Sequence, residues 1–261
     1  MSTWTRITTE QRGHVYLIGL NRPEKLNAAD EQMLQEISLA YGELDKNPQL
    51  RVGLVFAHGD HFTAGLDLND VGPKLASGAL AMVPEGGLDP WGMSTRQVSK
   101  PVVMAIQGTC FTLGVELALA SEIIVAAENA RFAQLEVTRG ILPFGGGTIR
   151  FPQAAGWSNA MRYLLTGESF DANEAMRMSL VTEVVAAGQE FNRALELATR
   201  IAEQAPLAVQ ATLASARGMT PEADREKLMV VDRLKKLMKT NDVQRGMQAF
   251  ASKTPAKFEG D

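Results

Sequence analysis

Two glutamates stand inside apolar runs of the sequence, where a carboxyl group could do acid–base chemistry. Glu116 lies in TLGVELALAS, a stretch that offers no polar face when wound into a helix. Glu136 lies in FAQLEVTRG, just before a turn. Burial disfavours the charged form of a carboxyl group, which tunes it to exchange a proton near neutral pH. Taken alone, Glu116 is more often a structural residue bonded to backbone donors or to an arginine. The second glutamate favours a shared cleft in which one acid gives a proton and the other takes one.

Two glycine-bearing turns could supply the other half of such a site. In TAGLDL and in TLGVEL a glycine adjoins the expected start of a helix. Backbone N–H groups at a helix start have no partner within the helix, so they are available to bind an anion. If both turns face one cleft, they form an oxyanion hole with two donors, each worth about 3 kcal/mol to a developing negative charge. The alternative, that these glycines only turn the chain, stays open.

Other chemistries find little support. All three histidines lie in the first quarter of the chain, and no G-x-S-x-G surrounds a serine, so a serine hydrolase is not indicated. The spacing of His58, Asp60, His61 and Asp67 matches no metal motif, and a solvated turn explains it better. FGGGTIR lacks the Gly-Lys-Ser/Thr of a phosphate-binding loop, and no G-x-G-x-x-G is present. Cys110 has no histidine nearby and is expected to be a small packed residue.

Composition is typical of a globular protein and fits a reducing compartment. The 261 residues carry a formal net charge of -4, with a sequence pI near 5.5, and no Lys/Arg run. This balance disfavours a nucleic-acid partner. No apolar run approaches the length of a membrane span, and the N-terminal segment lacks the features of a signal peptide. A single cysteine excludes an intrachain disulfide, so we expect a cytoplasmic location.

The pattern of elements predicts an α/β core followed by helices. A hairpin with its turn at Arg12–Gly13 opens the chain, and a helix carries apolar residues at helical spacing until Asn47–Pro48. Apolar runs at 51–59, 101–108 and 122–129 predict buried strands, and 130–137 is expected to continue in extended form. Alternating strands and helices up to about residue 140 indicate a parallel sheet. Beyond residue 146, Asp171 and Thr220–Pro221 mark helix starts.

Residues 70–100 differ from the rest of the chain in their amino-acid composition. Glycines and prolines break this stretch, which nevertheless carries Met82, Trp91 and Met93. A long segment with little regular structure is usually functional or mobile. The three large side chains either line an apolar binding pocket or cover the core, and the sequence leaves both open.

Several segments, taken in order, resemble the signature segments of the crotonase (enoyl-CoA hydratase/isomerase) family. They run from about residue 21 to 185: NRPEKLNA, HFTAGLDL, KPVVMAIQG, VELALASEIIVA, ARFAQLEVTRGILPFGGG and RYLLTGESFDANEA. The resemblance implies an α/β spiral of β-β-α units over residues 1–195. It also implies a helical C-terminal region over 196–261 that supports a homotrimer, often as a dimer of trimers. Members bind acyl-CoA thioesters, and coenzyme A is part of the substrate rather than a separate cofactor.

The resemblance also assigns roles to residues. By position, the backbone N–H groups of Leu66 and Leu113 would hold the enolate of the thioester, while Glu116 would activate water and Glu136 would give a proton to C2. The remaining positions would bind coenzyme A: backbone around Ala64 and Leu68 at the adenine, Lys25, and Lys253, which is assigned to the coenzyme A of a neighbouring subunit. No residue is assigned to a metal.

The sequence departs from the family pattern at two places. Thr112 and Leu113 replace two of three consecutive glycines, and Phe144 stands where glycine is common, so the space for the acyl group and the water is narrowed. The leading hypothesis is a 2-enoyl-CoA hydratase, since we expect isomerases to lack the first acid. Isomerase, thioester hydrolase or decarboxylase chemistry and a non-catalytic CoA-binding role remain as alternatives.

Overall fold

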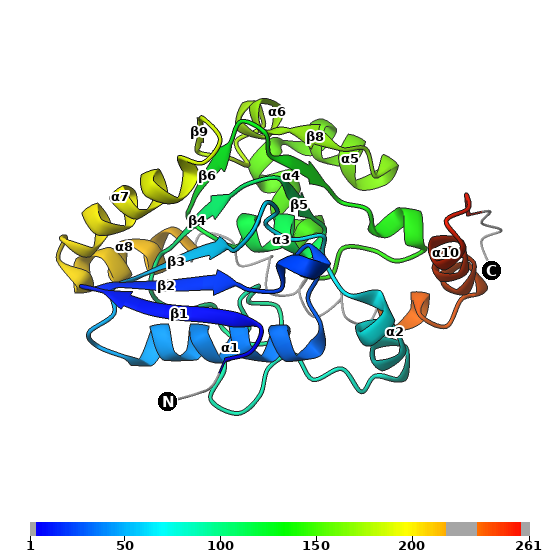
Figure 1. Ribbon diagram of the computed structural model, residues 1–261, viewed down its shortest axis with the longest axis horizontal. Coiled ribbons are helices and arrows are strands. Elements are labelled where there is room, and N and C mark those ends of the chain that lie inside the picture. The colour runs from blue at the N-terminus through cyan, green and yellow to red at the C-terminus, as the bar shows by residue number, and fades with distance from the viewer. Residues whose placement is uncertain (1–3, 218–233, 257–261) are drawn as a thin grey trace.

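The computed structural model describes residues 4–217 and 234–256, which form two sheets flanked by helices (Figure 1). The larger sheet has the order β1-β2-β3-β4-β6-β9, and the smaller one the order β5-β7-β8. In the larger sheet the strands are β1 (Ile7–Arg12), β2 (Val15–Leu20), β3 (Val52–Ala57), β4 (Val102–Ile106), β6 (Ile123–Ala127) and β9 (Glu183–Val185). In the smaller sheet they are β5 (Thr109–Phe111), β7 (Arg131–Ala133) and β8 (Phe170–Asp171). The predicted hairpin is β1 and β2, and all later neighbours in the larger sheet pair in parallel, as predicted.

Helices cover both faces of the larger sheet because its strands are apolar on both sides. Every residue of β2 and β4 is buried. One face, which includes Leu17 and Val103, packs against the alanines of α7 (Glu190–Ala202). The other face, which includes Ile18 and Met104, belongs to the main core together with α1 (Glu31–Lys46).

A strand-strand-helix unit repeats along the chain, and the ends of its short strands bring distant segments together. β4 enters the larger sheet, β5 the smaller one, and α3 (Leu113–Leu119) follows at once. Before it, β3 is followed by a bridge from Thr63 to Cys110 and then by α2 (Leu68–Ser77). After it, β6 is followed by β7, which pairs in parallel with β5. Three chain segments therefore leave the smaller sheet side by side.

The other helices that the structure describes include two 3-10 turns within the core, η1 (Pro23–Lys25) and η2 (Glu136–Arg139). They also include α4 (Gly147–Ala155), α5 (Trp157–Thr166), α6 (Ala172–Arg177), α8 (Pro206–Arg217) and α10 (Asn241–Ser252). Asp171 caps α6 by accepting from the N–H of Glu174 at 2.8 Å, as predicted. α10 packs on η2, where a side chain on Gly246 would collide with the backbone of Arg139. The helix start predicted at Thr220–Pro221 lies outside the described residues.

Two expectations about local structure need correction. Residues 70–100 were expected to be largely irregular, yet α2 continues to Ser77 with Pro73 inside it. Residues 130–137 were expected to be extended throughout, yet β7 ends at Ala133 and Glu136 begins η2. Among the described residues no helix combines the length and the apolarity that crossing a membrane requires.

Candidate active site

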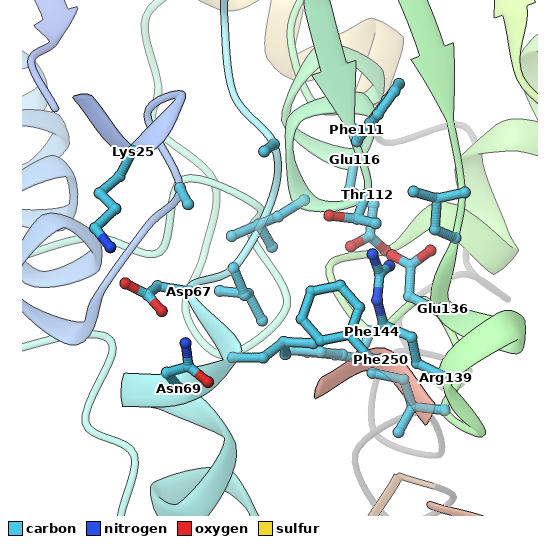
Figure 2. A pocket seen from close by; sticks show the side chains of 17 residues that line it. Lys25, Asp67, Asn69, Phe111, Thr112, Glu116, Glu136, Arg139, Phe144 and Phe250 are labelled. Carbon is cyan, nitrogen blue, oxygen red and sulfur yellow. The ribbon is translucent and has the colours of Figure 1, made fainter. Parts of the chain in front are cut away.

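Three corners of the fold meet at one cavity of about 370 Å³ (Figure 2). Thr63, β5 and β7 lie next to one another in the smaller sheet, so the chain that follows each of them reaches the same place. The residues delivered there include the four that the sequence places at the reacting centre: Leu66, Leu113, Glu116 and Glu136. The complete lining comprises Lys25, Ala28, Ala64, Leu66, Asp67, Leu68, Asn69, Phe111, Thr112, Leu113, Glu116, Leu135, Glu136, Arg139, Ile141, Phe144 and Phe250.

Two backbone amides at this cavity are available as donors. Leu113 is the first residue of α3, so its N–H has no partner within the helix. Leu66 lies in the turn before α2, where the neighbouring amides of Gly65 and Asp67 donate to Thr63 Oγ1 and to the carbonyl of Ala29. Within residues 4–217 and 234–256, neither the Leu66 nor the Leu113 amide donates a hydrogen bond. Both residues line the cavity, which is the arrangement that an oxyanion hole needs.

Thr112 holds the second of these turns in an unusual conformation. Its φ of 50° and ψ of −112° belong to a region that glycine adopts readily and a β-branched residue rarely does. The hydroxyl packs against Gly65, where a side chain would collide with Thr112 Oγ1. The threonine at position 112, where the family pattern has glycine, therefore fits because Gly65 on the facing turn has no side chain.

Glu116 is buried in α3 with only 1% of its surface exposed, and its carboxyl group lies between cavity and backbone. Oε1 accepts a hydrogen bond from the N–H of Gly147 at 2.8 Å. A side chain at Gly145 would come within 2.8 Å of Glu116 Oε2, so the glycine-rich segment makes room for the acid. Burial, and then the charge of Glu136, raise the pKa of Glu116 well above its ordinary value. The structural and the cavity-facing interpretations of Glu116 thus both hold.

Glu136 faces the same cavity from η2 (Figure 2). Burial raises its pKa to about 7, against the opposing charge of Arg139. The buried amide of Gln134 lies behind it and, with its nitrogen directed inward, donates to Glu136 Oε1 at 3.3 Å and to the Thr112 carbonyl at 3.1 Å. That carbonyl belongs to the same peptide group as the Leu113 N–H. One side chain therefore connects Glu136 to the peptide group that carries the Leu113 amide.

The hydrogen bonds by which Trp91 and Arg150 support the site were not predicted from the sequence. The Trp91 indole donates to the Leu113 carbonyl at 3.1 Å, and Arg150 donates to the Trp91 carbonyl at 2.7 Å and to the Gly145 carbonyl at 3.2 Å. No sequence motif predicts these hydrogen bonds, because each joins segments that are distant in the sequence. Arg139 had one usable signal, since it stands three residues after Glu136 and thus in the same turn of chain.

The residues assigned to coenzyme A lie at the same cavity as the acids or at the one that adjoins it. Lys25, Ala64 and Leu68 line the cavity, and Figure 2 shows Lys25 on the side opposite Glu136. Lys253 lines an adjoining cavity that shares Phe250 and Arg139 with the first, so it lies beside the site of its own chain.

Two open questions from the sequence are settled by packing. Trp91 is buried in the core, and Met82 and Met93 pack against it. None of the three is among the residues that line the cavity, so their packing favours the core-covering alternative. Cys110 is fully buried, as predicted. Among the described residues, no group of three His, Cys, Asp or Glu side chains is placed to hold a metal ion.

Comparison with known proteins places the chain in a family. A family model described as enoyl-CoA hydratase/isomerase matches residues 10–261. The enoyl-CoA hydratase EchA19 of Mycobacterium tuberculosis is 31% identical over 96% of this chain and 95% of its own. The 2,3-dehydroadipyl-CoA hydratase of Escherichia coli is 32% identical over 97% of this chain and 98% of its own. A crystal structure of a probable enoyl-CoA hydratase/isomerase from Mycobacterium abscessus is 47% identical, with a TM-score of 0.81 over 99% of this chain and 100% of that one.

The mixed α/β fold brings the amides of Leu66 and Leu113 and the buried carboxyl groups of Glu116 and Glu136 to one cavity. The chain belongs to the enoyl-CoA hydratase/isomerase family, which is the crotonase family that its sequence segments resemble.

Proposed function

We propose that this protein is an enoyl-CoA hydratase that adds water across the 2,3 double bond of a 2-enoyl-CoA thioester. The observation that carries the proposal is the presence of both acids, Glu116 and Glu136, in one cavity with the amides of Leu66 and Leu113. Full-length relatives named as hydratases support the same reaction. The reaction needs only water and groups of the chain besides the CoA thioester.

The oxyanion hole would stabilise the charge that water addition creates. The amides of Leu66 and Leu113 would bind the thioester oxygen, which becomes negative as the enolate forms. Loss of one such donor typically costs about 3 kcal/mol of transition-state stabilisation. The hydrogen bond from Trp91 to the Leu113 carbonyl and that from Gln134 to the Thr112 carbonyl would hold the donor peptide in place before substrate arrives.

Glu116 and Glu136 would each transfer one proton during the reaction. Glu116 would take a proton from water as the oxygen bonds to C3, and Glu136 would give a proton to C2, so that the double bond becomes a C–OH and a C–H. A proton returning from Glu116 to Glu136 resets the pair. In the free protein the burial of Glu116 and the charge of Arg139 beside Glu136 favour the proton on Glu116. Substrate binding would therefore have to shift this proton before the addition.

Hydration of enoyl-CoA thioesters tests the proposal. The wild-type protein should remove the ultraviolet absorbance of the conjugated thioester from 2-enoyl-CoAs of several chain lengths. Glu116→Gln and Glu136→Gln should each lower kcat by about 10²- to 10⁴-fold, with unchanged circular dichroism. Glu128→Gln, at an exposed position, is the matched control and should keep full activity. A wild type that hydrates no member of the series would rule out the hydratase proposal.

The family also suggests an assembly and a location. We infer a homotrimer or a dimer of trimers acting in the cytoplasm, with coenzyme A bound along Lys25, Ala64, Leu66 and Leu68 and with Lys253 close by.

A further inference from the structure

Arg139 is a half-buried cation at the cavity whose side chain makes no hydrogen bond to any residue that the structure describes. Arg139 ends η2, three residues after Glu136, and lines the cavity that holds both acids. Its Nε is buried without a hydrogen-bond partner, and the guanidinium forms no ion pair with any residue in the described ranges. Burial lowers the pKa of Arg139, which reflects the cost of this charge away from water. Such a group is normally paired, so its placement needs a reason.

Other arginines of the core show the usual pattern. Arg22 pairs with Asp67 at 2.8 Å, and Arg217 pairs with Glu122 at 2.6 Å. Arg150 is also buried, but it donates to two backbone carbonyls. Arg139 differs because its neighbours leave its donors unused.

Phe250 of α10 fixes the orientation of this guanidinium. The carbon at the centre of the guanidinium lies over the Phe250 ring, 4.8 Å from its centroid. This contact uses none of the N–H donors of the arginine, and the fork of donors on a guanidinium matches the two oxygens of a carboxylate. Figure 2 shows the Arg139 guanidinium directed into the cavity toward the acids, with Lys25 on the opposite side. The site that Arg139 offers is thus at the reacting end of the cavity.

We propose that Arg139 binds a carboxylate carried by the acyl chain of the substrate, so that the protein prefers 2-enoyl-CoAs ending in a carboxylate over uncharged ones. This inference rests on the proposed hydratase function and names its substrate class. A substrate carboxylate would satisfy the unused donors of Arg139. It would also offset the positive charge of Arg139, which lowers the pKa of Glu136, and so favour the protonated Glu136 that donation to C2 requires. The preferred substrate would then help to place the proton.

Matched substrates test the preference directly. Wild-type protein is assayed with trans-2-enoyl-CoAs of five to eight acyl carbons that end in a methyl group, in a carboxylate or in a trimethylammonium group. We expect kcat/KM to be at least about tenfold higher for the best carboxylate substrate than for its methyl counterpart, and lowest for the cationic series. Equal values for the carboxylate and methyl series, or a preference for the cationic series, would overturn the proposal.

Variants of Arg139 separate recognition from other roles. Arg139→Met should abolish the carboxylate preference, because it should lower kcat/KM for carboxylate-ended substrates by at least about tenfold more than for their methyl-ended counterparts. Arg139→Lys keeps the positive charge without the planar guanidinium and should keep part of the carboxylate preference. This variant replaces Arg139→Met in the assay if the Met variant fails to fold. Arg200→Met, at an exposed site on α7, is the control and should change nothing. Equal losses on all substrates would show instead that Arg139 serves Glu136 or a phosphate of coenzyme A.

Binding without turnover keeps this inference distinct from the proposed function. Calorimetry with saturated acyl-CoAs compares adipyl-CoA with hexanoyl-CoA, for both the wild type and Arg139→Met. Tighter binding of adipyl-CoA that disappears in the variant would support recognition by Arg139 even if no enoyl-CoA is hydrated. Hydration of enoyl-CoAs together with equal binding of the two saturated ligands would leave the hydratase proposal intact and refute the role of Arg139.

Discussion

At the scale of single residues, the protonation of Glu136 links stability to pH. Burial raises the pKa of Glu136 from its ordinary value of 4.5 to about 7 in the folded protein. Between these values the folded state holds a proton that the unfolded state has released, so the free energy of unfolding falls as pH rises and levels off above about 7. The shift corresponds to roughly 3 kcal/mol at most.

Glu136→Gln should remove this penalty. We expect the variant to be more stable than the wild type by about 2 kcal/mol at pH 8 and to lose that advantage below pH 5, as measured by urea unfolding across pH. Glu85→Gln, at an exposed position, is the control and should leave the pH dependence as it is. If Glu136→Gln stabilised the protein equally at pH 5 and pH 8, the raised pKa of Glu136 would not be the cause of the stabilisation.

Thr112 permits a second test at the same scale, this time of backbone strain. Its φ of 50° and ψ of −112° are unfavourable for any residue with a side chain. Thr112→Gly and Thr112→Ala both remove the buried hydroxyl and methyl groups, but only glycine also removes Cβ and so relieves the backbone. The glycine variant should therefore be more stable than the alanine variant by about 1 to 2 kcal/mol, the reverse of the order usual within helices. Thermal unfolding of the pair measures the difference, and an alanine variant of equal or greater stability would argue against strain.

At the scale of elements, the loop after α2 contacts the proposed oxyanion hole through Trp91, although it contains no helix or strand from residue 79 to 101. Asp89 holds it together by accepting from the amides of Trp91, Met93 and Ser94. Trp91→Phe would delete the bond to the Leu113 carbonyl and leave a small void. We expect a loss of about 1 to 3 kcal/mol in stability and a fall in kcat larger than the change in KM. Trp157→Phe, with Trp157 71% exposed, is the control that should alter neither quantity.

Sequence patterns predicted the elements better than the contacts between them. Apolar runs identified β3, β4 and β6, because strands buried on both faces read as continuous apolar segments. The turns that carry Leu66 and Leu113 were also found, since a glycine beside a helix start has a local signature. The roles of Gln134, Trp91 and Arg139 depend on segments brought together only by folding. The short turn η2 was missed because it lacks a full helical period, and the division of the chain after residue 195 stays a prediction.

At the scale of the whole molecule, the surface carries apolar side chains suited to association. Trp157 and Leu165 lie eight positions apart on α5, and they are 71% and 69% exposed. Residues at this spacing share one side of a helix, and large side chains so exposed on a common side are typical of contacts between proteins. The family resemblance implies trimers, so we expect this side of α5 to be covered by a second copy of the chain.

Light scattering tests this expectation in solution. The wild-type protein should have three or six times the mass of the 28.3 kDa chain. The double variant Trp157→Glu, Leu165→Glu should shift toward the mass of a single chain, because two carboxylates would have to be desolvated in the contact. Gln204→Glu adds a charge at an exposed site elsewhere and should leave the mass unchanged. A wild type with the mass of one chain would contradict the expected assembly, whereas an assembled double variant would show that α5 lies outside the contact.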